Sequence, residues 1–120
     1  MLDVERLEIA YGNAVAIRDV SLVVRERELV TVVGPNGAGK TTLINGLAGL
    51  LPTRSGTLRL DGVDLRALPS HHFCRHGIAL VPEGRRLFGA MTVEENLEMG
   101  CYAAAPRAHR GASLERVYAL

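Results

Sequence analysis

The sequence predicts an α/β fold that begins with a β-subdomain. Two early stretches alternate apolar and polar residues as strands do, a third is continuously apolar and rich in β-branched residues, and a helical pattern begins shortly after it. A strand that leads through a short loop into a helix is the repeating unit of α/β proteins. The 120 residues, 48% of them hydrophobic, suffice for one modest core.

The two N-terminal strands are each expected to bury one face. Residues 17–25 form the second of them, and the charged residues 25–28 form the turn that follows. Residues 29–33 read LVTVV, which is typical of a strand covered on both faces, so we expect this strand to be central in a sheet. The apolar members of the first strand, over residues 2–11, are Leu2, Val4, Leu7, Ile9 and Tyr11.

A helix is predicted directly after a glycine-rich loop. Leu43, Leu47 and Leu50 recur at helical spacing, and Pro52 marks the point by which the helix has ended. Shorter strands are predicted at residues 57–61 and 78–81, where turn residues close each apolar run.

Two further helices are predicted near the C-terminal end. Residues 92–95 read TVEE, a capping box that opens a helix through about Gly100. Another helix starts at Ser113, with an apolar stripe that runs to the last residue. Residues 101–112 resemble a linker, so we expect a main domain over residues 1–100 and a separate segment over 101–120.

Charge and hydropathy argue against several classes of partner. The formal net charge is +1 and the arginines are interspersed with acids, which does not favour nucleic acid. Asp3 and Glu5 stand where a secretory signal would be basic and then apolar. The longest uncharged run, residues 41–53, is too short to cross a bilayer, so we expect a soluble chain whose membrane role comes through a partner.

The cysteines and histidines give a weak signal for a metal site. Cys74 and Cys101 lack the Cys-x-x-Cys spacing, which indicates reduced thiols rather than a disulfide or a metal site. His71, His72 and His76 could face a metal from one helix, but no carboxylate or cysteine stands at ligand spacing.

The loop between the expected central strand and its helix has the composition of a phosphate site. It reads GPNGAGKTT over residues 34–42, and Lys40 is the only lysine of the chain. Glycines permit positive φ angles, so successive backbone N–H groups can point at one anion. The lysine supplies a mobile charge for the outer phosphates, and the Thr41 hydroxyl is placed to bind a phosphate-bound Mg²⁺. Residues 34–41 match the full pattern G-x-x-x-x-G-K-[ST].

Two other interpretations of the loop remain open. A glycine-rich turn between a strand and a helix could bind nothing. Alternatively, Asp61 lies about twenty residues past Gly39, where a dinucleotide-binding fold would hold a ribose hydroxyl. The glycine order favours the phosphate loop, because the dinucleotide pattern is G-x-G-x-x-G and the last glycine here is followed by lysine.

Further motifs accompany the loop: Tyr11-Gly12, SGTL at residues 55–58, Asp61-Gly62, VPEGRRLF at 81–88 and MTVEENL at 91–97. Together with the loop, and in this order along nearly the whole chain, they resemble the ATP-binding cassette of ABC transporters. The resemblance implies a P-loop NTPase core with an antiparallel N-terminal β-subdomain, and the start of a helical subdomain over residues 101–120. It also implies ATP and Mg²⁺ as cofactors.

The resemblance assigns nucleotide-binding residues. Tyr11 would stack on adenine, and an aromatic face holds any base without reading its edge. The alternative is that Tyr11 only closes the first strand. The loop residues expected to bind the nucleotide are Gly34, Pro35, Asn36, Gly37, Ala38, Gly39, Lys40, Thr41 and Thr42.

Glu83 departs from the pattern of most cassettes, which carry glutamine at this position near Mg²⁺ and the attacking water. A carboxylate can still bind Mg²⁺, so the expected metal ligands are Thr41 and Glu83. The alternative is that Glu83 is a solvated loop carboxylate. Arg85 and Arg86 are expected either to be surface charges or to contact a permease.

The stretch VPEGRRLF with glutamate resembles the second ATPase subunit of branched-chain amino acid importers. That resemblance implies a peripheral subunit on the cytoplasmic face of a bacterial inner membrane that couples ATP hydrolysis to uptake. The implied partners are membrane permease subunits, a second ATP-binding subunit and, indirectly, a solute-binding protein; nucleic acid is not among them.

No complete catalytic site is expected within these residues. The sequence contains neither a signature loop of the L-S-G-G-Q type nor an Asp-Glu pair, and His109 cannot serve as the family's switch histidine without that pair before it. We therefore expect the 120-residue chain alone not to hydrolyse ATP. Two other functions remain open: a non-catalytic nucleotide-binding remnant or fragment, and a small-molecule kinase with the same loop, which Tyr11 and VPEGRRLF disfavour.

Overall fold

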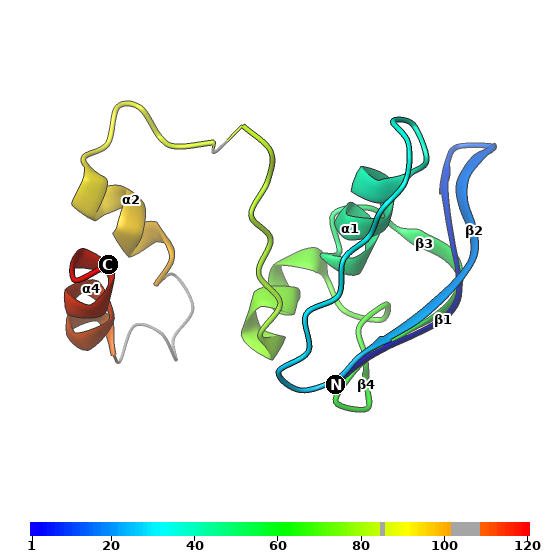
Figure 1. Cartoon of the computed structure of the whole chain (residues 1–120), viewed down its shortest axis with the longest axis horizontal. Helices are drawn as coiled ribbons and strands as arrows, with labels where there is room; N and C mark the ends of the chain where they lie inside the picture. The colour runs from blue at the N-terminus through cyan, green and yellow to red at the C-terminus, as the bar shows by residue number, and fades with distance from the viewer. Residues whose placement is uncertain (85, 102–108) are drawn as a thin grey trace. The chain divides into compact units, whose positions relative to one another are not determined.

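The computed structural model describes residues 1–84, 86–101 and 109–120 (Figure 1). It divides into two units, Met1–Ala79 and Leu80–Leu120, which are described separately. No helix within the described residues combines the length and the apolar composition that a membrane span needs.

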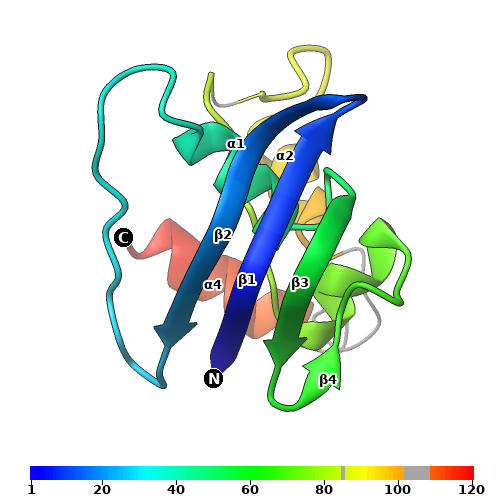
Figure 2. The same ribbon diagram turned by 90° about the vertical axis from the view of Figure 1, so that its right-hand side faces the viewer.

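The first unit is built on a four-stranded antiparallel sheet with the order β2-β1-β3-β4. Figure 2 shows β2, β1 and β3 side by side, with α1 behind them. The two predicted N-terminal strands are confirmed, and the strand predicted at residues 57–61 is present as β3, which begins earlier and pairs with β1 along most of its length. The strands are β1 (Leu2–Tyr11), β2 (Ala14–Val24), β3 (Thr53–Leu60) and β4 (Val63–Asp64).

The buried face of β1 changes phase along the strand. Val4 and Leu7 are both buried although they are three positions apart, whereas strict alternation would bury every second residue. Arg6 lies at this step with φ 49°, and the pairing of β1 with β2 shifts register between Val4 and Leu7. The bulge turns the later apolar residues of β1 back to the core.

Neighbouring strands are irregular at the same level. On β2, Asp19 has φ 53°, and its Oδ1 forms an ion pair with Arg6 Nε at 3.4 Å. On β3, Gly56 has φ 91°, and a Cβ at this position would collide with the carbonyl of Arg6. The bulges therefore lie side by side across three strands, and glycine is required where the backbones approach most closely.

The core of the first unit lies between this sheet, the helix α1 (Lys40–Leu47) and the 3₁₀ helix η1 (Ser70–His76). Gly46 of α1 is buried, and a Cβ there would run into Ile9 Cδ1, so glycine allows the helix to lie against β1. The buried apolar side chains are Val4, Leu7, Ile9, Ile17, Leu43, Leu58, Leu65 and Phe73.

Two predicted strands are wrong. Residues 29–33 form no regular strand, and Leu29 and Val33 are 91% and 84% exposed rather than covered on both faces. Residues 78–81 also form no strand. A strand needs a hydrogen-bonded neighbour, and the sheet in the described residues pairs only β2, β1, β3 and β4.

The second unit contains the helices α2 (Val93–Met99) and α4 (Arg110–Tyr118). The capping box is confirmed: Thr92 Oγ1 accepts from the Glu95 backbone N–H at 3.2 Å, and the Thr92 backbone N–H donates to Glu95 Oε2 at 2.7 Å. The last helix begins before the predicted Ser113, and its residues are not buried. Most of the predicted linker, residues 102–108, lies outside the described residues.

Candidate nucleotide-binding site

The loop before α1 has the backbone conformation that the glycine pattern predicts. Gly37 and Gly39 adopt φ 83° and φ 89°, in the left-handed region that side chains rarely enter. The Ala38 N–H donates to the Pro35 carbonyl at 3.2 Å, which closes a turn. Gly39 is the N-cap of α1, so the loop leads directly into the positive end of the helix dipole.

Lys40 folds back over this loop. Its ammonium nitrogen Nζ donates to the carbonyl oxygens of Gly34 and Pro35, each at 2.7 Å. An ammonium group has three donors, so one remains for a ligand. No acidic residue stands in the first turn of α1, which leaves the positive charge of this region unopposed locally. The arrangement is suited to an anion.

Thr41 and Thr42 follow Lys40 in the first turn of the helix. Thr41 is exposed, so its hydroxyl is accessible to a ligand from solvent. Thr42 Oγ1 lies 3.3 Å from the hydroxyl of Tyr11, which is the last residue of β1. The structure thus brings Tyr11 to the phosphate loop, although 31 positions separate it from Thr42 in the sequence. The sequence carries no local signal for this contact.

Glu83 lies in the second unit and is exposed. It is followed by Gly84, with φ 78°, whose carbonyl accepts from the Arg86 N–H at 2.6 Å. The phosphate loop belongs to the first unit, and the role of Glu83 as a metal ligand stays a prediction. Arg85 lies outside the described residues.

The histidines of η1 are close together but do not complete a metal-ligand set. The rings of His71 and His72 meet edge to face, with centroids 4.5 Å apart. Partial removal from water, and then the neighbouring His71, lower the pKa of His72. In the part of the chain that the structure describes, no three His, Cys, Asp or Glu side chains are grouped so that they could hold a metal ion.

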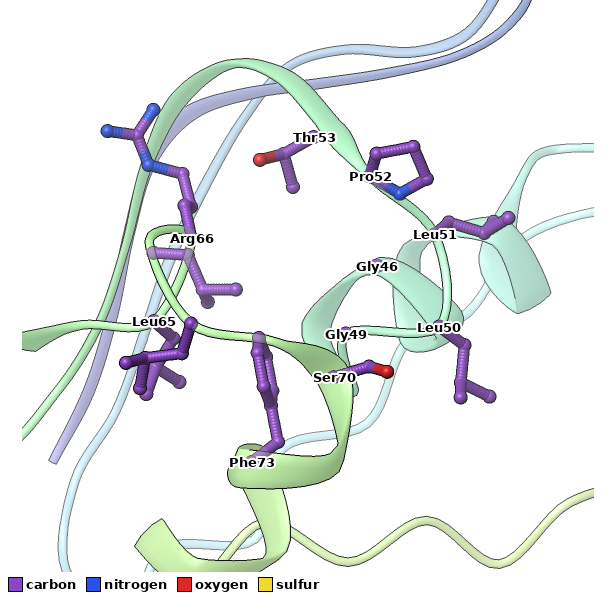
Figure 3. A pocket seen from close by; sticks show the side chains of 12 residues that line it. Gly46, Gly49, Leu50, Leu51, Pro52, Thr53, Leu65, Arg66, Ser70 and Phe73 are labelled. Atoms are coloured by element: carbon purple, nitrogen blue, oxygen red, sulfur yellow. The ribbon is translucent and has the colours of Figure 1, made fainter.

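A pocket of about 300 Å³ lies at the opposite end of α1 from the phosphate loop (Figure 3). Gly46 and Gly49 at the end of the helix, Phe73 of η1 and several leucines line it. Its one charged lining residue, Arg66, is already engaged: the side chain donates to the Gly56 carbonyl and to Asp64 Oδ2, the latter at 3.2 Å. The pocket is separate from the candidate nucleotide site, because neither Tyr11 nor any residue of the phosphate loop lines it.

The family description "ABC transporter" matches residues 17–119 of the sequence. The chain belongs to the ABC transporter family. The match includes the phosphate loop and extends almost to the last residue, so the dinucleotide-binding interpretation of Asp61 is wrong. In the structure Asp61 instead forms an ion pair with the N-terminal amine of Met1.

Relatives with similar sequences are named for branched-chain amino acid transport. The chain is 48% identical over 100 residues to the high-affinity branched-chain amino acid transport ATP-binding protein BraG of Pseudomonas aeruginosa, which covers 83% of this chain and 43% of BraG. It is 43% identical over 97 residues to LivG of Salmonella typhimurium, named for the same transport, with 81% and 38% covered. The chain thus spans less than half the length of these relatives.

Solved structures confirm the fold class. The ATP-binding subunit of an ABC transporter superposes with a TM-score of 0.73 at 31% identity, over 97% of this chain and 52% of that one. A dimeric bacterial ABC transporter cassette superposes with a TM-score of 0.77 at 24% identity, over 96% and 55%, and supports the fold alone. The α/β fold with an N-terminal antiparallel sheet is thus that of an ABC ATPase, of which these residues form the N-terminal part.

Proposed function

We propose that these residues form the N-terminal half of the ATP-binding subunit of an ABC importer, which takes up branched-chain amino acids. The observation that carries this proposal is the loop with Gly37 and Gly39 at positive φ and Lys40 folded over it. Its residues fit a triphosphate, because glycines at positive φ let successive backbone N–H groups point at one anion and the Lys40 ammonium keeps one donor for a ligand. The names of the similar relatives support the class of substrate.

Each residue of the site has a separate role in the proposed binding. Residues 34–39 hold the phosphates through their backbone, Lys40 neutralises the outer phosphates, and Thr41 is the proposed Mg²⁺ ligand of the loop. Tyr11 stacks on the base. When bound, Mg²⁺ would offset the charge that builds up on the phosphates during transfer.

The proposed assembly follows from the family. The subunit would lie on the cytoplasmic face of a bacterial inner membrane, bound to permease subunits, and would pair with a second ATP-binding subunit. A solute-binding protein would deliver the amino acid to the permease. Within the chain, the proposed division is an ATPase core over residues 1–100 and the start of a helical subdomain over 101–120.

A second candidate function is nucleotide binding without hydrolysis, as a remnant or fragment of such a subunit. It would use the same loop, with Gly37 and Gly39 at positive φ and Lys40 folded over it. The two candidates differ in ATP turnover and agree on ATP binding, so binding is the first property to test.

Lys40→Ala is predicted to abolish ATP binding. A charge-assisted contact of about 1.5–3 kcal/mol would be lost, which is roughly a ten- to hundredfold loss of affinity before any rearrangement of the loop. Calorimetry should be done with the complete subunit, meaning these 120 residues followed by the rest of a cassette. Arg18→Ala, which removes an exposed positive charge from β2, is the matched control. Equal affinity of Lys40→Ala and the unaltered protein would contradict the proposal.

A further inference from the structure

We infer that Thr42 is a positioning residue: its hydroxyl holds the ring of Tyr11 in place before a nucleotide binds. The contact is the 3.3 Å approach of Tyr11 Oη to Thr42 Oγ1. This inference rests on the proposed function, since it concerns how the base-binding aromatic of that site is oriented. It adds a role to Thr42 that is distinct from contact with a phosphate.

The distance between Tyr11 and Thr42 is set by the close packing of α1 on β1 and β2. A Cβ on Gly39 would lie 2.6 Å from Ile17 Cδ1 and 3.1 Å from the carbonyl oxygen of Ala16, so glycine lets the start of α1 press against β2. Two turns further on, Gly46 does the same against β1. Both ends of α1 are therefore seated on the sheet, and Thr42 lies between them.

The ring of Tyr11 has few other restraints. Tyr11 ends β1 and is 54% exposed, and Gly12 with φ 59° turns the chain directly after it. Among the described residues, its side chain makes no other hydrogen bond, and no second aromatic ring packs on it. Without the Thr42 hydroxyl, the exposed ring would be free to rotate about its side-chain bonds.

Holding the ring in advance favours binding. An exposed aromatic that must become fixed on binding loses rotational freedom at that moment, and a side chain fixed beforehand avoids this loss. The tether acts at the phenol oxygen, so it leaves the face of the ring available for stacking. Because Thr42 directly follows Thr41, the same turn of helix would align the base-binding and phosphate-binding parts of the site.

The test compares a ligand that has a base with one that lacks it. The dissociation constants of ATP and inorganic tripolyphosphate are measured by calorimetry on the complete subunit and its variants Tyr11→Phe, Thr42→Val, Thr42→Ser and the double variant Tyr11→Phe/Thr42→Val. A change in phosphate binding caused by Thr42 itself alters both dissociation constants alike, so it cancels in their ratio. The thermal unfolding of each variant shows whether its structure is generally destabilised. Tyr11→Phe removes the hydroxyl and keeps the ring that stacks on the base.

Tyr11→Phe should weaken ATP by about two- to tenfold, the range for one net hydrogen bond, and leave tripolyphosphate near the value of the unaltered protein. Thr42→Val should shift the ratio by the same factor, the double variant should shift it no further, and Thr42→Ser should restore it. If the unaltered protein binds both ligands but Tyr11→Phe leaves the ratio unchanged, or the two substitutions add, the inference is wrong while the proposed function stands. If the unaltered protein binds neither ligand, both are wrong.

Discussion

Glu83 carries a charged carboxylate where most cassettes of the family carry a neutral amide. Both side chains offer an oxygen to Mg²⁺, but the carboxylate is the stronger ligand and cannot donate a hydrogen bond. Glu83 is exposed in the structure and its neighbour Gly84 has a positive φ, so the side chain is accessible to a metal ion. We therefore propose that Glu83 contributes to the Mg²⁺ dependence of ATP turnover.

Glu83→Ala is predicted to raise the Mg²⁺ concentration that gives half-maximal ATP turnover in the complete subunit. Glu83→Gln, which restores the usual family residue, should raise it less, because the amide oxygen is retained without the charge. The measurement is turnover as a function of Mg²⁺ at fixed ATP. Identical Mg²⁺ titrations for all three proteins would make Glu83 a solvated loop carboxylate.

At the scale of single residues, the phosphate loop could be predicted from sequence because its conformation is local. Gly37 and Gly39 adopt positive φ, and Lys40 reaches back only to Gly34 and Pro35. The contact of Tyr11 with Thr42 could not be predicted in this way, since it depends on how α1 packs on two strands.

Among the elements, α2 follows from a local signal. Thr92 and Glu95 satisfy each other's backbone N–H groups. The Asn96 side chain also forms hydrogen bonds with the loop that precedes the helix. The Asn96 side chain accepts from the Phe88 N–H at 2.9 Å and donates to the carbonyls of Phe88 and Thr92 at 3.1 and 2.8 Å. The motif TVEENL thus specifies a helix together with the loop that enters it.

The stability of α2 is predicted to depend on pH through Glu95. Hydrogen bonds from the Thr92 backbone and hydroxyl hold the pKa of Glu95 below its ordinary value of 4.5. Since the folded pKa is the lower one, the stabilisation is fully present above pH 4.5 and is lost as the pH falls through the folded value. The protection of α2 amides relative to their intrinsic exchange rate should fall over this range, and Glu95→Gln should remove the dependence. A helix whose protection is unaffected by pH there would contradict the assignment.

The strands show where sequence patterns were sufficient and where they were not. The apolar pattern of β1 predicted the strand but not the bulge at Arg6, although the step from Val4 to Leu7 is present in the sequence. The apolar runs at residues 29–33 and 78–81 have strand composition but no hydrogen-bonded neighbour among the described residues. Composition predicts that a segment can be a strand, and pairing decides whether it is one.

For the whole molecule, the exposed apolar residues matter most. Leu29 and Val33 are almost fully exposed, and so is Val81. Surfaces of this kind lead to self-association unless they are covered. We therefore expect the 120-residue chain by itself to aggregate and to hold phosphate poorly.

The isolated chain is also predicted not to hydrolyse ATP. Phosphoryl transfer needs a residue that orients the attacking water, and removing such a base costs on the order of 10²–10⁴ in rate. Phosphate release by purified chain should match that of its Lys40→Ala variant. A monodisperse preparation with turnover that Lys40→Ala removes would show that an acid within these residues, Glu83 first among them, serves as the base.

The most direct test of the phosphate loop uses Lys40, which is the only lysine within these 120 residues, so that peptides from this part of the subunit report on it alone. In the complete subunit, acylation of Lys40 by an amine-reactive reagent is followed by mass spectrometry with and without ATP and Mg²⁺. The N-terminal amine, which pairs with Asp61, serves as an internal control. A nucleotide held by Lys40 should slow acylation of Lys40 and leave that of the N-terminal amine unchanged. Equal acylation of Lys40 in the presence and absence of saturating ATP would contradict the proposed role of the loop.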